Sequence, residues 1–75
     1  MKTKQITFYE LEKYMIIVNT FFPDASWEYA KVINSNTIDP KTFKNSVHVR
    51  FLDTHKNYYL PFELFKDKEI TIKLE

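Results

Sequence analysis

Two histidines and one aspartate come closest, by type and spacing, to a reactive or metal-binding set. His55 follows Asp53 by two positions, and His48 precedes both. A stable metal site takes three or four ligands that are themselves held by hydrogen bonds. Because this set falls short of that requirement, we interpret His55 as a turn residue and His48 as a strand-surface residue. We expect no metal site and no cofactor.

Cysteine and glycine are both absent from the 75 residues. Disulfides and thiolate chemistry need cysteine, and the turns that bring backbone close to phosphate need glycine. Glu10 and Glu12 are a close carboxylate pair, but on a helix they lie about 200° apart because each residue turns roughly 100°. A domain of this size also rarely encloses a catalytic cleft. We therefore expect neither enzymatic activity nor a small-molecule substrate.

A modest basic and aromatic set lies between Lys31 and Lys56. Its members are Lys31, Lys44, His48, Arg50 and Lys56, with Tyr29 and Tyr59 nearby. Cations beside exposed rings suit single-stranded nucleic acid, because phosphates pair with the charges and bases stack on the rings. The formal net charge is only +1, and dedicated nucleic-acid binders are usually far more basic. Nucleic-acid binding is therefore the second hypothesis, and an ordinary solvated sheet face is its alternative.

Apolar side chains exceed what a small core can hide. Aromatic residues make up 17% of the chain, and a domain of this size buries only about 60% of its unfolded surface. The surplus should stay exposed or meet a partner. The candidate protein-interaction residues are Tyr14, Ile16, Ile17, Phe21, Tyr59 and Phe65.

A helix is the first element expected to position these residues. Thr7-Phe8-Tyr9-Glu10 has the form of a capping box, which predicts that a helix begins there. Pro23 disfavours helical backbone at Phe22, so the helix should end close to that residue. Its apolar stripe comprises Phe8, Leu11, Met15, Val18 and Phe22. The β-branched run Ile16-Ile17-Val18 leaves a buried strand over 15–22 as the alternative.

The middle of the chain predicts one strand and one long loop. Pro23-Asp24-Ala25-Ser26 indicates a turn. The aromatic and β-branched content of Trp27–Ile33 favours a strand, although Asp24 could cap a short helix there instead. The polar segment over 34–46 contains Asp39-Pro40 and is expected to be an exposed loop.

The last third of the chain predicts three strands. Val47–Leu52 alternates and is followed by a turn over 53–57. The return arm begins at Tyr58, and Pro61 indicates an edge or a strand end because proline cannot donate to a ladder. A helical turn over 63–65 is the alternative for the end of this arm. A charged turn then precedes a half-buried strand over 70–74.

The assembled prediction is a single α+β domain over residues 1–75, with the N-terminal helix packed on a three- to four-stranded antiparallel sheet. A tryptophan-led strand, a VxVxF strand and a third strand follow one another in Trp27–Ile33, Val47–Leu52 and Tyr58–Phe62. This order resembles the middle strands of Tudor-like barrels. The resemblance implies a small, partly open β-barrel with an N-terminal helix as the alternative fold.

The leading functional hypothesis is a non-enzymatic protein-interaction module. Lysine outnumbers arginine ten to one, a bias typical of AT-rich genomes, so we expect a phage or mobile-element source. The expected partner is an unidentified host protein or a second copy of the chain, and the expected mechanism is inhibition by occlusion, as in anti-CRISPR and host-takeover proteins. The apolar run Tyr14–Val18 is shorter than the roughly 20 residues that span a bilayer. We expect a cytoplasmic protein without membrane contact.

Overall fold

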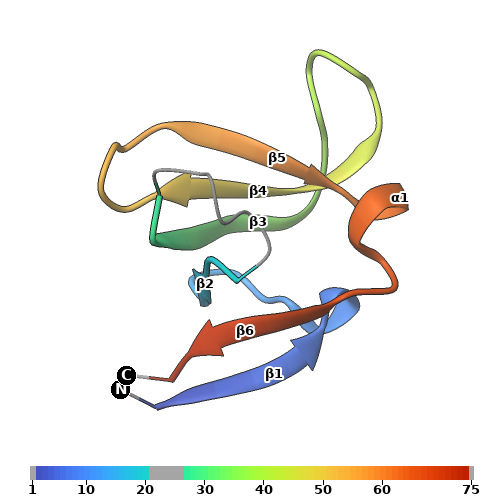
Figure 1. Cartoon of the computed structure of the whole chain (residues 1–75). Helices are drawn as coiled ribbons and strands as arrows, with labels where there is room; N and C mark the ends of the chain where they lie inside the picture. The colour runs from blue at the N-terminus through green and yellow to red at the C-terminus, as the bar shows by residue number, and fades with distance from the viewer. Residues whose placement is uncertain (1, 21–26, 75) are drawn as a thin grey trace.

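The computed structural model describes residues 2–20 and 27–74, and most of their regular structure is antiparallel sheet (Figure 1). The strands are β1 (Thr3–Thr7), β2 (Ile16–Val18), β3 (Tyr29–Ile38), β4 (Asn45–Phe51), β5 (Asn57–Pro61) and β6 (Glu69–Lys73). A 3-10 turn, η1 (Phe8–Glu10), follows β1, and a short helix, α1 (Phe62–Phe65), connects β5 to β6. These strands form one sheet in the order β1-β6-β2-β3-β4-β5.

The predicted N-terminal helix is wrong, and the α+β fold built on it is wrong with it. The capping box does form, because the Thr7 backbone N–H donates to Glu10 Oε1 at 2.9 Å. This hydrogen bond stabilises the charged carboxylate and lowers the pKa of Glu10. The box caps only one 3-10 turn, since Leu11 already has extended backbone at φ −62° and ψ 133°.

The β-branched run that favoured a strand forms the inner strand β2. Ile17 lies opposite Ala30 of β3 on one side and Ile72 of β6 on the other, and its side chain is fully buried. Pairing on both sides satisfies the backbone polar groups and buries a side chain that is stiff and well suited to strands. These tertiary contacts outweigh the helical spacing of apolar residues in the sequence.

The long loop expected over 34–46 is also wrong, because only residues 39–44 remain between β3 and β4. The register shifts between Val32 and Asn34 and again between Asn34 and Thr37. No residue of β3 beyond Val32 is buried, so this part of β3 tolerates polar side chains. A hydrogen bond from the Asp39 N–H to the Lys44 carbonyl, 3.0 Å long, closes the loop.

The strand predictions for the last third are confirmed in β4, β5 and β6. Pro61 ends β5, which is an edge strand of the sheet. The alternative helical turn after it is present as the four-residue α1. Within residues 2–20 and 27–74, no helix has the length and apolar character needed to cross a membrane. The cytoplasmic location stays a prediction.

The Tudor-like barrel is overturned as well, because the sheet is open. Among the described residues, β1 pairs only with β6 and β5 only with β4, so these strands form two separate edges. The sheet nevertheless curves around its core: β3, β4 and β5 lie on one side, β1 and β6 on the other, and β2 between them (Figure 1).

The core fills the space between these two parts of the sheet. Its apolar residues are Ile6, Phe8, Leu11, Ile17, Trp27, Ala30, Val32, Val47, Val49, Leu60, Phe65, Ile70 and Ile72. Ring pairs close both ends: Trp27 stacks on Phe51 with centroids 4.9 Å apart, and Phe8 stacks on Phe65 at 5.6 Å. Such pairs contribute about 0.5–1.5 kcal/mol beyond the buried area itself.

Candidate functional site

One row of side chains crosses the face of the sheet that points away from the core. The pairing registers place Lys73, Ile16, Lys31, Arg50 and Asn57 opposite one another in turn, on β6, β2, β3, β4 and β5. We call these five residues the cationic row. Adjacent strands lie roughly 4.8 Å apart, so Lys73 and Arg50, three strands apart, are separated by about 14 Å across the sheet.

The positive charge of the cationic row is not neutralised by the residues that the structure describes. Lys31, Arg50 and Lys73 form no ion pair with any of them. The outward positions of β2, β3, β4 and β5 hold no Asp or Glu. Glu69 faces outward on β6, but it lies four positions before Lys73 along the strand, a distance of about 13 Å.

The two lysines of the cationic row make cation–π contacts with tyrosine rings. Lys31 Nζ lies 5.6 Å from the ring centroid of Tyr14, and Lys73 Nζ lies 5.3 Å from that of Tyr29. Lys13 Nζ approaches the Tyr14 ring as well, at 5.1 Å. A cation within about 6 Å of a ring face is attracted by the ring quadrupole. The charges and the rings therefore form one continuous surface.

Tyr14 adopts an unfavourable backbone conformation at this position. Its φ is 77°, in the left-handed region that disfavours residues with bulky side chains. Its N–H donates to the Val32 carbonyl at 2.8 Å, which ties the turn to β3. The side chain is 64% exposed, so burial does not offset the strain. Strain retained at an exposed ring is typical of functional positions.

A polar cluster adjoins the β5 end of the cationic row. Asn57 Oδ1 accepts a hydrogen bond from Arg50 Nε at 3.4 Å and lies 3.0 Å from His48 Nε2. The His48 ring stacks on Tyr59, with centroids 4.7 Å apart and planes at 17°. Since one amide oxygen faces both basic side chains, Asn57 fixes the position of the guanidinium relative to the His48–Tyr59 stack.

A separate groove of about 450 Å³ opens where η1, the β3–β4 hairpin and α1 meet. We call it the aromatic groove; it is lined by Tyr9, Leu11, Ser35, Asn36, Asn45 and Phe62. The Tyr9 and Phe62 rings lie 5.5 Å apart at 32°. Tyr9 is 65% exposed, whereas Phe62 packs edge-on against the buried Phe8. One ring of the pair is therefore anchored and the other faces solvent.

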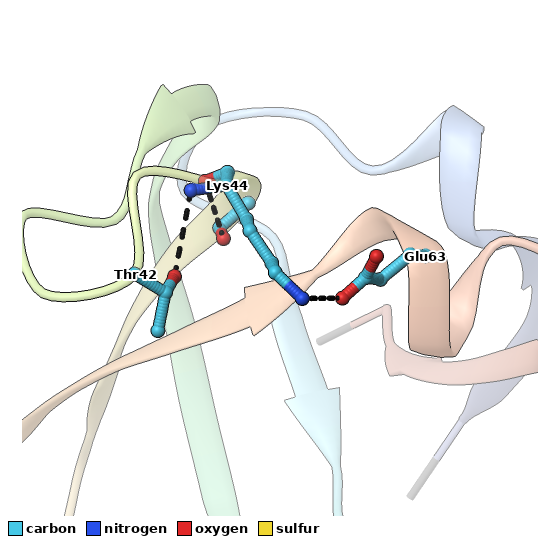
Figure 2. A network of polar contacts seen from close by, with 4 residues as sticks. Thr42, Lys44 and Glu63 are labelled. Atoms are coloured by element: carbon cyan, nitrogen blue, oxygen red, sulfur yellow. Dashed lines mark hydrogen bonds and ion pairs between the residues drawn. The ribbon is translucent and has the colours of Figure 1, made fainter.

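A second hollow of about 380 Å³ continues the aromatic groove through Asn45 and Phe62 toward the hairpin loop. At its rim, the Lys44 ammonium pairs with the Glu63 carboxylate of α1, and the Lys44 N–H donates to Thr42 Oγ1 at 3.4 Å (Figure 2). Exposed ion pairs contribute only about 0–1 kcal/mol. The Lys44–Glu63 ion pair therefore connects the loop to α1 but contributes little to the stability of the fold.

The predicted protein-interaction residues do not form one patch. Ile17 and Phe65 belong to the core, with 0% and 6% exposure, so their assignment to a contact surface is wrong. Strand alternation turns Ile17 inward, and α1 packs Phe65 on Phe8. Phe21 lies outside the described residues. The remaining three are beside or within the cationic row: Tyr14, Ile16 and Tyr59.

The predicted nucleic-acid residues are partly brought together. Lys31 and Arg50 are direct neighbours across the β3–β4 ladder, and His48 follows on the same face. Lys44 is excluded from this surface by its ion pair with Glu63 at the hairpin loop. Lys56 lies in the turn that precedes β5 and is exposed.

The histidines are not neighbours. His48 lies opposite Tyr59 in the β4–β5 ladder, whereas His55 sits in the turn beyond β4 with φ 59°. Within residues 2–20 and 27–74, no three side chains of His, Asp or Glu gather closely enough to hold a metal ion.

Several residues of these surfaces were missed from the sequence. Lys73 joins the cationic row only through the pairing of β6 with β2, which has no local sequence signal. Tyr9 was hidden by the helical interpretation, in which it fell outside the main stripe. Phe43 did carry a signal, because it is an isolated ring in a polar segment, and it is 79% exposed.

No protein-family model, curated protein or solved structure matches this chain. The two surfaces are therefore the basis for inferring function.

Proposed function

We propose that the protein is a non-enzymatic interaction module that binds an extended, proline-containing segment of a partner protein in the aromatic groove. The exposure of large apolar side chains around this groove carries the proposal. Tyr9 of η1 lines the groove and is 65% exposed, and Phe43 of the hairpin loop lines the adjoining hollow and is 79% exposed. Two segments that are distant in the sequence thus present exposed rings along the groove and its continuation.

Aromatic residues at such a site suit the role of anchors. Interface binding energy is concentrated in a few well-packed residues, among which tyrosine is enriched, and each contributes more than about 1 kcal/mol. Tyr9 lies against the partly buried Phe62, so its ring is pre-oriented and loses little side-chain freedom on binding. The groove is therefore prepared for a ligand without rearrangement of the core.

The groove chemistry favours an extended ligand over a helical one. A polyproline II segment makes no internal hydrogen bonds, so its carbonyl groups are available to donors of a partner. The side-chain amides of Asn36 and Asn45 line the groove and make no hydrogen bond with the described residues. Proline rings pack well against aromatic walls. The rings of the groove can therefore contact the proline rings of such a segment, and the free amide donors can bind its carbonyl groups.

The proposed mechanism is steric, because a segment held in the aromatic groove is covered and no longer accessible to other proteins. Occlusion needs affinity and placement but no bond making. The expectation that the chain derives from a phage or mobile element and acts on a host protein stays a prediction.

The test is selection of a random peptide library on the immobilised protein, followed by affinity measurement of the enriched peptides. We expect enrichment of proline-containing sequences. Tyr9→Ser should weaken their binding by about tenfold or more, the change that corresponds to a loss of roughly 1.4 kcal/mol at an anchor residue.

Tyr14→Ser is the matched control, because Tyr14 is 64% exposed and Tyr9 is 65% exposed, and Tyr14 does not line the groove. It should leave peptide affinity unchanged. Thermal unfolding of both variants shows that they remain folded. Failure to enrich any peptide, or equal losses in the two variants, would contradict the proposal.

A further inference from the structure

We infer that the cationic row and its flanking rings form a second binding site, for single-stranded RNA. This site is independent of the aromatic groove, since the two share no residue. The phosphates would follow Lys73, Lys31 and Arg50 across the strands, and the bases would lie against the rings beside them.

Charge complementarity identifies the ligand as a polyanion. Three cations on three strands face the same side, and none of them forms an ion pair with a described residue. The ring contacts at 5.3 and 5.6 Å keep the Lys73 and Lys31 ammonium groups near the sheet surface. A neutral or basic peptide gains nothing from this arrangement, whereas each phosphate that replaces a counterion does.

The rings distinguish a single strand from a duplex. Tyr14 is exposed beside Lys31, the His48–Tyr59 stack adjoins Arg50, and the half-buried Ile16 lies between the two lysines of the row. Unpaired bases stack on aromatic faces, and each stacked base contributes about 1–3 kcal/mol. A duplex keeps its base faces covered and has no use for such a surface.

The polar cluster at Asn57 favours RNA over DNA. Asn57 Oδ1 already faces Arg50 and His48, but its amide N–H groups donate to no described residue. A ribose 2′-hydroxyl can accept from such a group and is the feature by which proteins distinguish RNA from DNA. A nucleotide whose phosphate lies on Arg50 would bring its ribose next to this amide.

The experiment is fluorescence anisotropy of labelled oligouridylate with the full chain at several salt concentrations. With three phosphate contacts and a slope of about −0.7 per contact for single strands, the log–log salt slope should be about −2. Affinity should then fall by roughly 20-fold between 50 and 200 mM salt. Lys31→Gln should reduce the slope to about −1.4, so that the same salt change costs about sevenfold.

Lys44→Gln is the matched control, because it makes the same change of residue and charge at the Glu63 ion pair, away from the cationic row. It should retain the full slope. Lys73→Gln repeats the test at the other end of the row, and the thermal midpoint of each variant verifies folding. Loss of affinity in Lys44→Gln equal to that in Lys31→Gln, or binding that is insensitive to salt, would overturn the inference.

Two further measurements separate the ligand classes and the two sites. Oligodeoxythymidylate should bind more weakly than oligouridylate, and Asn57→Ala should remove that preference. Equal affinity for both oligonucleotides in the wild-type chain would rule out the RNA assignment. Tyr9→Ser should not alter RNA binding, so failure of the groove proposal and failure of this one are distinguishable.

Discussion

At the scale of single residues, the absence of glycine shapes the turns. Tyr14, Phe43 and His55 have φ of 77°, 61° and 59°, values that a glycine would adopt without steric cost. Two of these three residues carry rings that are more than 60% exposed, so neither is kept there for core packing. Tyr14 lies beside the cationic row, and Phe43 lines the hollow that continues the aromatic groove. At Tyr14 and Phe43, glycine would make the turn more stable, but only the aromatic residue places an exposed ring at the surface.

Two substitutions of Phe43 separate these roles. Phe43→Ala removes the ring but keeps a residue that disfavours φ 61°, whereas Phe43→Gly removes both the ring and the strain. We expect the glycine variant to have a free energy of unfolding about 1 kcal/mol higher than the alanine variant. Both should weaken peptide binding to the same extent. Urea denaturation and peptide titration provide the two values.

Equal stability of the two Phe43 variants would show that the loop relaxes out of the left-handed conformation. Unchanged peptide binding in both would remove Phe43 from the interaction surface.

At the scale of elements, the strand predictions for the last third of the chain are confirmed, and the helix prediction for the N-terminal part is wrong. Local signals were sufficient where a strand alternates and a turn follows, as in Val47–Leu52. They failed for Ile16-Ile17-Val18, because a three-residue strand is defined by the neighbours that pair with it, β3 and β6. The capping box at Thr7 formed as predicted but led into a single turn.

The candidate sites show the same division. The sequence correctly grouped Lys31, His48 and Arg50, because they lie on strands adjacent in the chain. It could not include Lys73, which arrives from the last strand, or exclude Lys44, whose partner Glu63 is on another element. The register of strand pairing determines which cations lie next to one another, and local sequence patterns do not predict the register between distant segments.

The alternation of β2 gives a stability test at this scale. Ile17 is fully buried between two strands, whereas its neighbour Ile16 is half-buried on the opposite face. We expect Ile17→Ala to lower the free energy of unfolding by about 2–4 kcal/mol, through lost burial and a residual cavity. Ile16→Ala makes the same chemical change and should cost about 1 kcal/mol or less. Comparable losses by chemical denaturation would contradict the observed strand.

At the scale of the whole molecule, the sheet combines local and distant pairings. The β3–β4 and β4–β5 pairs join strands that follow one another along the chain, whereas β6 pairs with β1 and β2 from the opposite end. Closing long chain segments costs entropy before any contact is gained, which slows folding. The three-stranded unit β3-β4-β5 should therefore form first, and it also carries Lys31 and Arg50.

This order is testable with two core substitutions, Val47→Ala and Ile70→Val, at fully buried positions. Val47 pairs with Leu60 inside the β3-β4-β5 unit. Val47→Ala should lower the free energy of unfolding by roughly 2 kcal/mol, mainly by slowing folding, by about fivefold or more. Ile70 pairs with Ile6, which lies near the other end of the sequence. Ile70→Val should lower the free energy of unfolding by about 1 kcal/mol, mainly by accelerating unfolding, by about fourfold. Stopped-flow measurements over a range of denaturant concentrations give both rates. The strand pair that is formed in the transition state determines which substitution affects the folding rate. If Ile70→Val slowed folding and Val47→Ala left the folding rate unchanged, the folding nucleus would lie in the terminal strands instead.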